Sequence, residues 1–302
     1  MDNPVGNDPL LPFNSVTITH APAHLHRKIP PVRTFWTMTP ATPTPPALSA
    51  IDELRCALDA AAFAELRLGL SLDPWQIDVV RSVAPRMAMA CSRQIGKSTV
   101  TGIKASHVAI YEPGALIICL APGLRQASEL LRKIRANLVS AAVPLVGDAA
   151  TQLELANGSR ILSLPASSDL IRGYSAVRLI LADECAFFET DDVLDAATPM
   201  LATNPSAQLI LLSTFNLAQG AFYNAFKPNS GFETYKIDVR QCPRITQAFL
   251  DAELARCGEQ IFAREYMCAI MSEGEFAFFG ADILSRLAER EGKPALHFTL
   301  FT

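Results

Sequence analysis

Apolar residues between positions 86 and 214 follow two alternating patterns. Short runs that are almost wholly apolar are typical of strands buried on both faces of a parallel sheet. The stretches between them have a period near 3.6 residues, which is typical of amphipathic helices. The strands are predicted at 86–91, 115–121, 177–184 and 207–214, and the helices at 97–111, 124–138 and about 191–201. This alternation predicts an α/β fold with a doubly wound, mostly parallel sheet.

Further elements are predicted within and after this region. Residues 151–165 form two alternating segments joined at Asn157-Gly158, a dipeptide that favours a tight hairpin turn. Another strand is predicted at 232–239. Residues 245–272 have a helical pattern, and we interpret them as part of a small helical lid subdomain.

Two helices are predicted ahead of the first strand. Residues 47–69 have a helical period that brings four apolar side chains near one face, namely Leu54, Leu58, Phe63 and Leu66. The stretch "DPWQIDVVRSV" begins a second helix, with Asp73 as its cap and Pro74 in its first turn. Residues 1–46 hold ten of the 21 prolines, a density that excludes regular helix or sheet and predicts a disordered leader.

Composition narrows the class of protein. The chain has 302 residues, of which 50% are hydrophobic and 19% charged, as expected of a soluble and well-packed protein. No apolar run reaches the ~18 residues that a membrane helix needs. The net charge of −4 gives no overall basic field, so any DNA contact must use a local patch. Four residues form basic helix faces that we expect to be solvated: Lys104, Arg125, Arg132 and Lys133.

The cysteine pattern bears on location. Seven cysteines are scattered along the chain without a C-x-x-C pair. This pattern favours reduced, buried thiols over disulfides or zinc ligands, and therefore a cytoplasmic protein. The N-terminus also lacks the basic-then-apolar pattern of an export signal.

The stretch "ACSRQIGKST" at 90–99 half-matches a phosphate-binding loop. Such a loop needs backbone N–H groups that point inward, a helix N-terminus, a lysine and a hydroxyl group for Mg²⁺. Here a predicted strand comes before, a predicted helix comes after, and Gly96, Lys97 and Ser98 lie at the join. Cys91 replaces the usual first glycine, but that glycine only eases the exit from the strand. We expect Lys97 to reach the β- and γ-phosphates, and Thr99 to assist at the α-phosphate.

A pair of carboxylates follows the next strongly apolar strand. "LILADE" ends in Asp183 and Glu184, where a phosphate-loop enzyme places its second acidic group. We expect Asp183 to bind Mg²⁺ through water and Glu184 to orient the attacking water. The alternative is a surface pair that caps the following helix.

Two weaker motifs lie around these. In "LLSTFN" at 211–216, Ser213, Thr214 and Asn216 end a buried strand where they could sense the γ-phosphate, although ordinary caps and turn formers have the same composition. In "DPWQ" at 73–76, Gln76 is placed to pair with the adenine edge while Trp75 packs nearby.

Together these motifs resemble the ATPase domain of the large terminase subunit of tailed bacteriophages, the motor that packages DNA into a procapsid. "SRQIGKST" is similar to the family's variant phosphate loop, "LILADECAFF" to its Walker B segment and "DPWQ" to its adenine-reading motif. "SSDLIRGYSA", "LLSTFN…GAFY" and "FAREYMCAI" resemble the segment before Walker B, the coupling motif and the end of the lid. The resemblance covers about 70–275.

The resemblance implies a P-loop NTPase of the RecA-like ASCE class that hydrolyses ATP with Mg²⁺. Its catalytic residues would be Glu184, Lys97 and Arg93, the last in the place of an arginine that contacts the γ-phosphate or couples the loop to movement. Ser98 and Asp183 would hold the metal. The implied nucleotide site comprises Trp75, Gln76, Ser92, Arg93, Gln94, Ile95, Gly96, Lys97, Ser98 and Thr99, and the implied coupling residues are Ser213, Thr214 and Asn216.

The resemblance also implies domains and partners. The leader 1–46 would be followed by an ATPase core at 47–240, a lid at 241–275 and a tail at 276–302. The partners would be double-stranded DNA, a portal protein and a small terminase subunit, with the chain forming a ring at work, or a monomer in solution, in the host cytoplasm. An arginine finger for a neighbouring subunit would come from one of three candidates: Arg172, Arg256 or Arg264.

The chain departs from this family's pattern in two places. Phe215 stands where the coupling motif usually has a proline, which weakens the expected link between hydrolysis and DNA movement. Residues 276–302 are too few for the family's RNase H-like nuclease, so we expect this chain not to cut DNA. Two alternatives stay open: another nucleic-acid-dependent, helicase-like ATPase, which would need a second RecA-like domain, and a non-catalytic prophage relic.

Overall fold

The computed structural model describes residues 48–216 and 218–270. Eight strands form one sheet in the order β3-β4-β5-β2-β6-β7-β1-β8. Every pairing is parallel except those that β4 makes with β3 and β5. The strands are β1 Arg86–Cys91, β2 Leu116–Ala121, β3 Leu145–Ala149, β4 Gln152–Leu155, β5 Arg160–Pro165, β6 Leu179–Asp183, β7 Gln208–Ser213 and β8 Glu233–Ile237. The predicted mostly parallel α/β sheet is confirmed.

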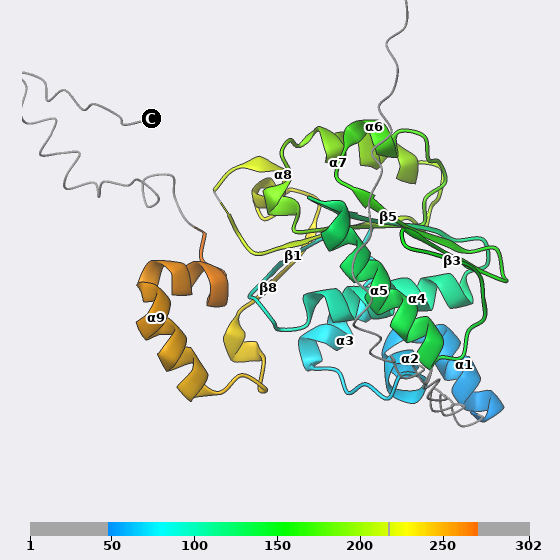
Figure 1. The fold of residues 1–302 in the computed structure, drawn as a ribbon, viewed down its shortest axis with the longest axis horizontal. Helices are drawn as coiled ribbons and strands as arrows, with labels where there is room; N and C mark the ends of the chain where they lie inside the picture. The colour runs from blue at the N-terminus through cyan, green and yellow to red at the C-terminus, as the bar shows by residue number, and fades with distance from the viewer. Residues whose placement is uncertain (1–47, 217, 271–302) are drawn as a thin grey trace, which may run out of the picture. The chain divides into compact units, whose positions relative to one another are not determined.

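Helices cover both faces of this sheet (Figure 1). One face carries α1 Ala50–Leu58, α2 Ala60–Leu66, α3 Pro74–Arg81, α4 Lys97–Tyr111 and α5 Leu124–Ser140, and the other carries α6 Ser168–Ile171, α7 Asp192–Ala197 and α8 Gly220–Asn224. Because successive side chains of a strand point to opposite faces, β1 contributes to two cores. Met87 and Met89 pack with the first group of helices, and Ala88 and Ala90 pack with the second.

The first predicted helix, 47–69, is wrong in one respect, because the chain breaks at Asp59 into α1 and α2. The Asp59 backbone is extended (φ −139°, ψ 112°), and its carboxylate accepts a hydrogen bond from the Ala61 N–H and so caps α2. Because of this break, the apolar side chains of α1 and α2 do not share one buried face. Leu54 and Leu58 are exposed by 59% and 77%, whereas Phe63 is buried.

Other boundaries differ from the prediction in smaller ways. The helix predicted at about 191–201 ends as α7 and continues as the 3₁₀ turn η2 Thr198–Leu201, because Pro199 cannot donate a backbone hydrogen bond. Two further 3₁₀ turns, η1 Cys185–Phe187 and η3 Val239–Gln241, follow β6 and β8. The hairpin turn at Asn157-Gly158 joins β4 to β5 as predicted.

The last described helix is α9, Gln247–Tyr266. The Thr246 hydroxyl accepts a hydrogen bond from the Phe249 N–H and caps it, and Gly258 interrupts the helical backbone with a positive φ of 77°. This helix lies in the predicted lid, whose boundaries stay a prediction. The predicted leader 1–46 and tail 276–302 lie outside the described residues. Within the described part of the chain, no helix has both the length and the apolar character of a membrane span.

Candidate active site

The neighbouring strands β6, β7 and β1 bring polar residues to one edge of the sheet. Asp183 at the end of β6 pairs in register with Leu212 of β7, and the next residue of β7, Ser213, pairs with Ala90 of β1. Because these strands are parallel, their carboxyl ends meet at the same edge, where ligands of such sheets bind. The predicted loop and carboxylates therefore lie together.

The loop 92–96 joins β1 to α4 and ends in a residue that must be glycine. Gly96 has a φ of 101°, a left-handed conformation that L side chains rarely adopt. A Cβ atom there would also lie 2.9 Å from Nε2 of Gln76. The Thr99 and Val100 N–H groups donate to the Gly96 carbonyl. The first two N–H groups of α4, those of Lys97 and Ser98, precede any acceptor that the helix offers, so this end of α4 can receive an anion.

The loop is held from both sides. The Ser92 N–H donates to the Ile237 carbonyl (2.9 Å), and the Arg93 N–H donates to the Glu265 carbonyl (3.0 Å). Ile95 is buried, whereas Ser98 and Thr99 lie half-buried in the first turn of α4. The Ser92 hydroxyl is buried without a hydrogen-bond partner among the described residues.

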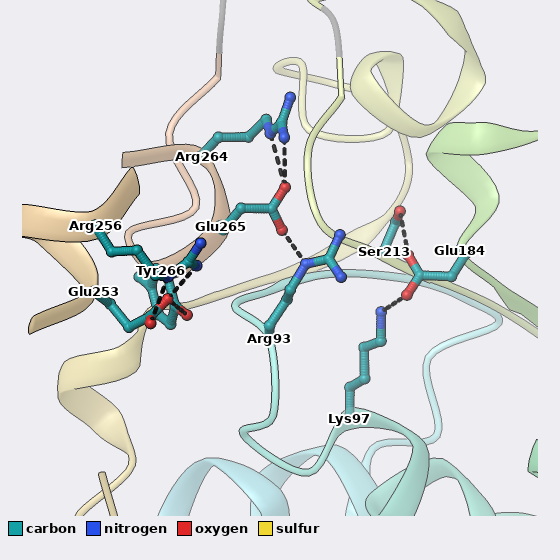
Figure 2. A network of polar contacts seen from close by, with 9 residues as sticks. All are labelled: Arg93, Lys97, Glu184, Ser213, Glu253, Arg256, Arg264, Glu265 and Tyr266. Carbon is teal, nitrogen blue, oxygen red and sulfur yellow. Dashed lines mark hydrogen bonds and ion pairs between the residues drawn. The ribbon is translucent and has the colours of Figure 1, made fainter. Parts of the chain in front are cut away.

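Lys97 reaches both carboxylates at the end of β6. Figure 2 shows its contact with Glu184. Its Nζ forms a close ion pair with Glu184 and lies 3.8 Å from Oδ1 of Asp183. The second carboxylate oxygen of Glu184 accepts a hydrogen bond from the Ser213 hydroxyl at 3.3 Å. Burial raises the pKa of Asp183, and the charge of Lys97 opposes that rise. One group from each of three motifs thus meets in a single network.

Glu184 is held in an unusual backbone conformation. Its φ is 52°, which costs energy for a residue with a side chain and persists only where the surroundings fix it. Its N–H donates to the Asp183 carboxylate at 3.0 Å. The Glu184 side chain points to Lys97 (Figure 2).

No three His, Cys, Asp or Glu side chains within 48–216 and 218–270 are grouped so as to hold a metal ion alone. The oxygen donors that the site does offer still suit Mg²⁺ beside a nucleotide. Magnesium is usually held by one or two carboxylates plus substrate phosphates, with water in the remaining positions. The buried Asp183 carboxylate and the Ser98 hydroxyl fit that requirement.

The predicted coupling residues are only partly brought together. Ser213 contacts Glu184, and Thr214 is buried beside it in sequence. Asn216 lines a cavity that η1 and the start of α8 also line. Phe215 is 1% exposed, and its ring packs against those of Phe222 and Phe226 with centroids 5.5 and 5.0 Å away. The residue that replaces the family's proline is therefore a core residue.

Arg93 pairs with Glu265 of α9 (Figure 2). Its Nε forms an ion pair with Glu265 on α9, and the other carboxylate oxygen of Glu265 accepts from Nε of Arg264 at 2.8 Å. The Glu265 side chain is only 8% exposed. No sequence motif identifies Glu265, because an ion pair between segments so far apart leaves no local pattern.

Trp75 and Gln76 are both buried at the start of α3. Oε1 of Gln76 accepts from the Asp73 N–H at 2.9 Å, so this carboxamide caps the helix, and its Nε2 faces Gly96. The Trp75 Nε1 has no partner among the described residues. The Asp73 carboxylate accepts two hydrogen bonds from Arg244, at 3.0 and 2.7 Å. Arg244 is a second residue that the sequence analysis missed.

The other basic residues fall into two groups. Lys104 corrects the expectation of a solvated face, because it is 5% exposed and its Nζ donates to the carbonyls of Val80 and Ser82. Burial lowers its pKa to about 8. The other three predicted face residues are exposed: Arg125, Arg132 and Lys133.

The three candidates for an arginine finger differ in their surroundings. Arg172 is exposed just after α6. Arg256 pairs with Glu253 of the same helix at 2.6 Å, and Arg264 pairs with Glu265. A role for any of them in a neighbouring subunit stays a prediction. All seven cysteines are free thiols, and only Cys257 is not fully buried.

Comparisons with known proteins converge on one family. The family model described as "Terminase large subunit, T4likevirus-type, N-terminal" matches residues 88–284. This match includes the phosphate loop, both carboxylates and the coupling segment.

Solved structures with the same fold carry related names. The large terminase ATPase domain of Thermus phage P74-26 is 20% identical, with a TM-score of 0.59, over 69% of this chain and 97% of that one. A mutant of that domain gives a TM-score of 0.61 at 19% identity, over 69% of this chain and 98% of that one. The large terminase of a thermophilic bacteriophage is 12% identical, with a TM-score of 0.60, over 70% of this chain and 57% of that one.

Proposed function

The chain belongs to the T4-like family of terminase large subunit N-terminal regions, and we propose that it uses ATP hydrolysis at the carboxyl edge of its sheet to move double-stranded DNA. The observation that carries the proposal is the contact of Lys97 with Glu184 and of Glu184 with Ser213, which unites three separate motifs. The large terminase of the thermophilic bacteriophage, which shares the fold, has been solved with ADP and with ATP-γ-S.

In this proposal the polyphosphate lies on the loop 92–96 and the first turn of α4. The backbone N–H groups of that turn and the charge of Lys97 attract it. Ser98 and Asp183 would hold Mg²⁺, which when bound neutralises the charge that develops on the phosphates. The raised pKa of Asp183 reflects burial of its carboxylate, which the charge of Lys97 only partly offsets, and a bound cation would favour the charged form.

Glu184 is proposed to orient the attacking water and to accept its proton. The ion pair with Lys97 engages one carboxylate oxygen of Glu184. A γ-phosphate on the loop competes for Lys97, which frees one carboxylate oxygen of Glu184 for water. The Ser213 hydroxyl keeps its hold on the other oxygen and limits the rotation of the side chain. Nucleotide binding therefore prepares the base.

Movement requires that the state of the phosphate loop reach another part of the molecule. Arg93 is bound to α9 through both its N–H and its guanidinium, so a change in the loop is transmitted to α9 without an intermediate residue. We infer that the working form includes a ring of these chains with a portal protein and a small terminase subunit on DNA, as the family resemblance implies.

The proposal is tested by the ATPase activity of the purified chain, with and without double-stranded DNA. We expect weak turnover alone, stimulation by DNA, and loss of both in Lys97→Ala and Glu184→Gln. Glu129→Gln, a change of an exposed carboxylate on α5, serves as the matched control and should turn over normally. Turnover in Glu184→Gln equal to that of the control would refute the role of Glu184. The absence of turnover from the unmodified chain under all conditions would favour a non-catalytic relic.

A further inference from the structure

Glu184 keeps its left-handed conformation only if the chain is held on both sides of it, because a strained residue persists where the surroundings over-determine it. On one side lies β6, which is fixed between β2 and β7 in the sheet. On the other side lies η1, whose bonds are local. The Phe187 N–H donates to the Glu184 carbonyl at 2.9 Å, and the Phe188 N–H donates to the Cys185 carbonyl at 3.2 Å. The strain at Glu184 therefore needs a restraint beyond η1.

Asp191 supplies such a restraint. It comes just before α7, a position where aspartate usually accepts an N–H group of its own helix. Its Oδ1 instead accepts the Ala221 N–H, in α8, at 2.9 Å. Gly220, just before Ala221, has a φ of 82°, and a Cβ atom added there would lie 3.6 Å from the same carboxylate oxygen. The segment that follows Glu184 is thus tied to α8.

The helix at the other end of this bond is anchored in the core. Phe222 of α8 is 3% exposed. The centroid of its ring lies 5.5 Å from that of Phe215 and 5.3 Å from that of Phe226, and the rings of Phe215 and Phe226 are 5.0 Å apart. Three rings in mutual contact resist displacement, because moving one of them opens a gap against the other two. α8 is therefore a firm attachment point for Asp191.

Packing alone does not hold the two segments together. They line opposite sides of a cavity of about 390 Å³, one formed by residues that follow Glu184 and the other by residues that follow Ser213. Dispersion contacts are lost across such a gap, so a directional bond that spans it matters more than it would in a filled core. Asp191 and Ala221 both line this cavity, and their hydrogen bond joins its two sides.

We propose that Asp191 is a positioning residue for Glu184. Its bond to α8 keeps Glu184 in the left-handed conformation that holds the carboxylate against Lys97 and Ser213. Without this bond the backbone at Glu184 relaxes to a conformation of lower energy, and the carboxylate leaves the place of the attacking water. The phosphate loop is held by other contacts, so nucleotide affinity does not depend on Asp191. This inference rests on the role of Glu184 in the proposed function.

The experiment measures ATP turnover by the full chain and, by calorimetric titration, its affinity for Mg²⁺-ADP. Asp191→Ala should lower kcat about tenfold, less than the roughly 100-fold that a 1 Å misplacement can cost, without raising KM for ATP or weakening ADP binding. Asp191→Asn keeps an acceptor oxygen in the same place and should retain the kcat of the unmodified chain. Asp192→Ala is the matched control, because it removes the same charge from the next residue, which is exposed on α7.

A combined variant tests whether Asp191 acts through Glu184. In Glu184→Gln the base is already lost, so adding Asp191→Ala should reduce single-turnover rates little further, whereas residues that act separately would multiply their losses. Multiplied losses, an unchanged kcat in Asp191→Ala, or an equal fall in Asp191→Asn or Asp192→Ala would overturn the positioning role alone. So would a loss of ADP binding that parallels the loss of turnover. Failure of the unmodified chain to bind ADP or to turn over ATP would overturn the proposed function itself.

Discussion

The candidate site has two walls that are built in different ways. The sheet wall consists of the carboxyl ends of β6, β7 and β1 with the start of α4, and it holds Lys97 and Asp183, whose side chains are 14% and 12% exposed. The helix wall consists of α9 and the segment before it. Its links to the rest of the site run through Arg93 and Arg244, whose side chains are 62% and 56% exposed.

From this difference we expect the sheet wall to carry out catalysis and the helix wall to modulate it. Contacts on the sheet wall lie where strand register and the start of α4 place them, and their charged side chains are 12–30% exposed. Electrostatic interactions are stronger at such partly buried positions than in water. Ion pairs with an exposed partner are weaker and can be exchanged at little cost. We therefore expect changes in the sheet wall to abolish turnover, and changes in the helix wall to alter how turnover responds to DNA.

The largest effect is expected for Glu184→Gln in the sheet wall. Turnover should fall by a factor of about 100 to 10,000, the usual contribution of a positioned base. Nucleotide affinity should stay the same or rise, because Lys97 loses the carboxylate that competes with phosphate for it. Single-turnover kinetics with a parallel binding titration measure both quantities. A matching loss of affinity would indicate that Glu184 supports the fold of the loop instead.

The sheet wall could be predicted from sequence because each of its parts is local. β1, β2, β6 and β7 are buried on both faces and therefore appear as continuous apolar runs, and the loop and carboxylates follow such runs directly. β3 cannot be predicted in this way, because "LVGDA" is not a continuous apolar run. Its side chains are half-buried or exposed in the structure. The very short helices α6 and α8 were missed because they span about one turn each.

The helix wall could not be predicted in the same way. Glu265 and Arg244 act through partners far away in the chain, Arg93 and Asp73, and no spacing rule connects such positions. The break at Asp59 escaped prediction for a related reason. Its carboxylate is fixed by Arg81, so an otherwise continuous helical pattern is interrupted by a tertiary contact.

Lys104 belongs to the scaffold of the sheet wall. Lys104 lies on α4, the helix that begins with Lys97, and its pKa falls from 10.5 to about 8 because it is buried. Between these two values the unfolded chain holds a proton that the folded chain does not, so stability should rise with pH through this window. The rise should reach about 3 kcal/mol, since one pKa unit corresponds to about 1.4 kcal/mol.

Denaturant unfolding of the unmodified chain and of Lys104→Met between pH 8 and 10 isolates this contribution. The difference in unfolding free energy between the two proteins should change in favour of the unmodified chain as the pH rises. Thiols with raised pKa values, such as Cys119, affect both proteins alike and cancel in the difference. A difference that does not change with pH would mean that Lys104 is charged in water rather than buried.

A smaller effect is expected in the helix wall for Glu265→Gln. The substitution keeps the shape of the side chain and removes the charge that holds Arg93 and Arg264. Stimulation of ATPase activity by DNA should fall about fivefold, the lower end of typical coupling between sites, with a lesser effect on turnover without DNA. Glu259→Gln, on an exposed position of α9, is the control. Equal stimulation in both variants would place the coupling elsewhere.

The smallest effect is expected for Gln76→Leu, which lies where the two walls meet. If Gln76 only positions Asp73 and through it Arg244, ADP and GDP should both bind at most about threefold more weakly, the equivalent of less than one neutral hydrogen bond, and the ratio of their affinities should not change. If Gln76 reads the edge of adenine, the preference for ADP over GDP should vanish. Titration of both nucleotides against both proteins distinguishes these outcomes. An unchanged ratio would show that Gln76 holds the start of α3 against the phosphate loop and does not recognise adenine.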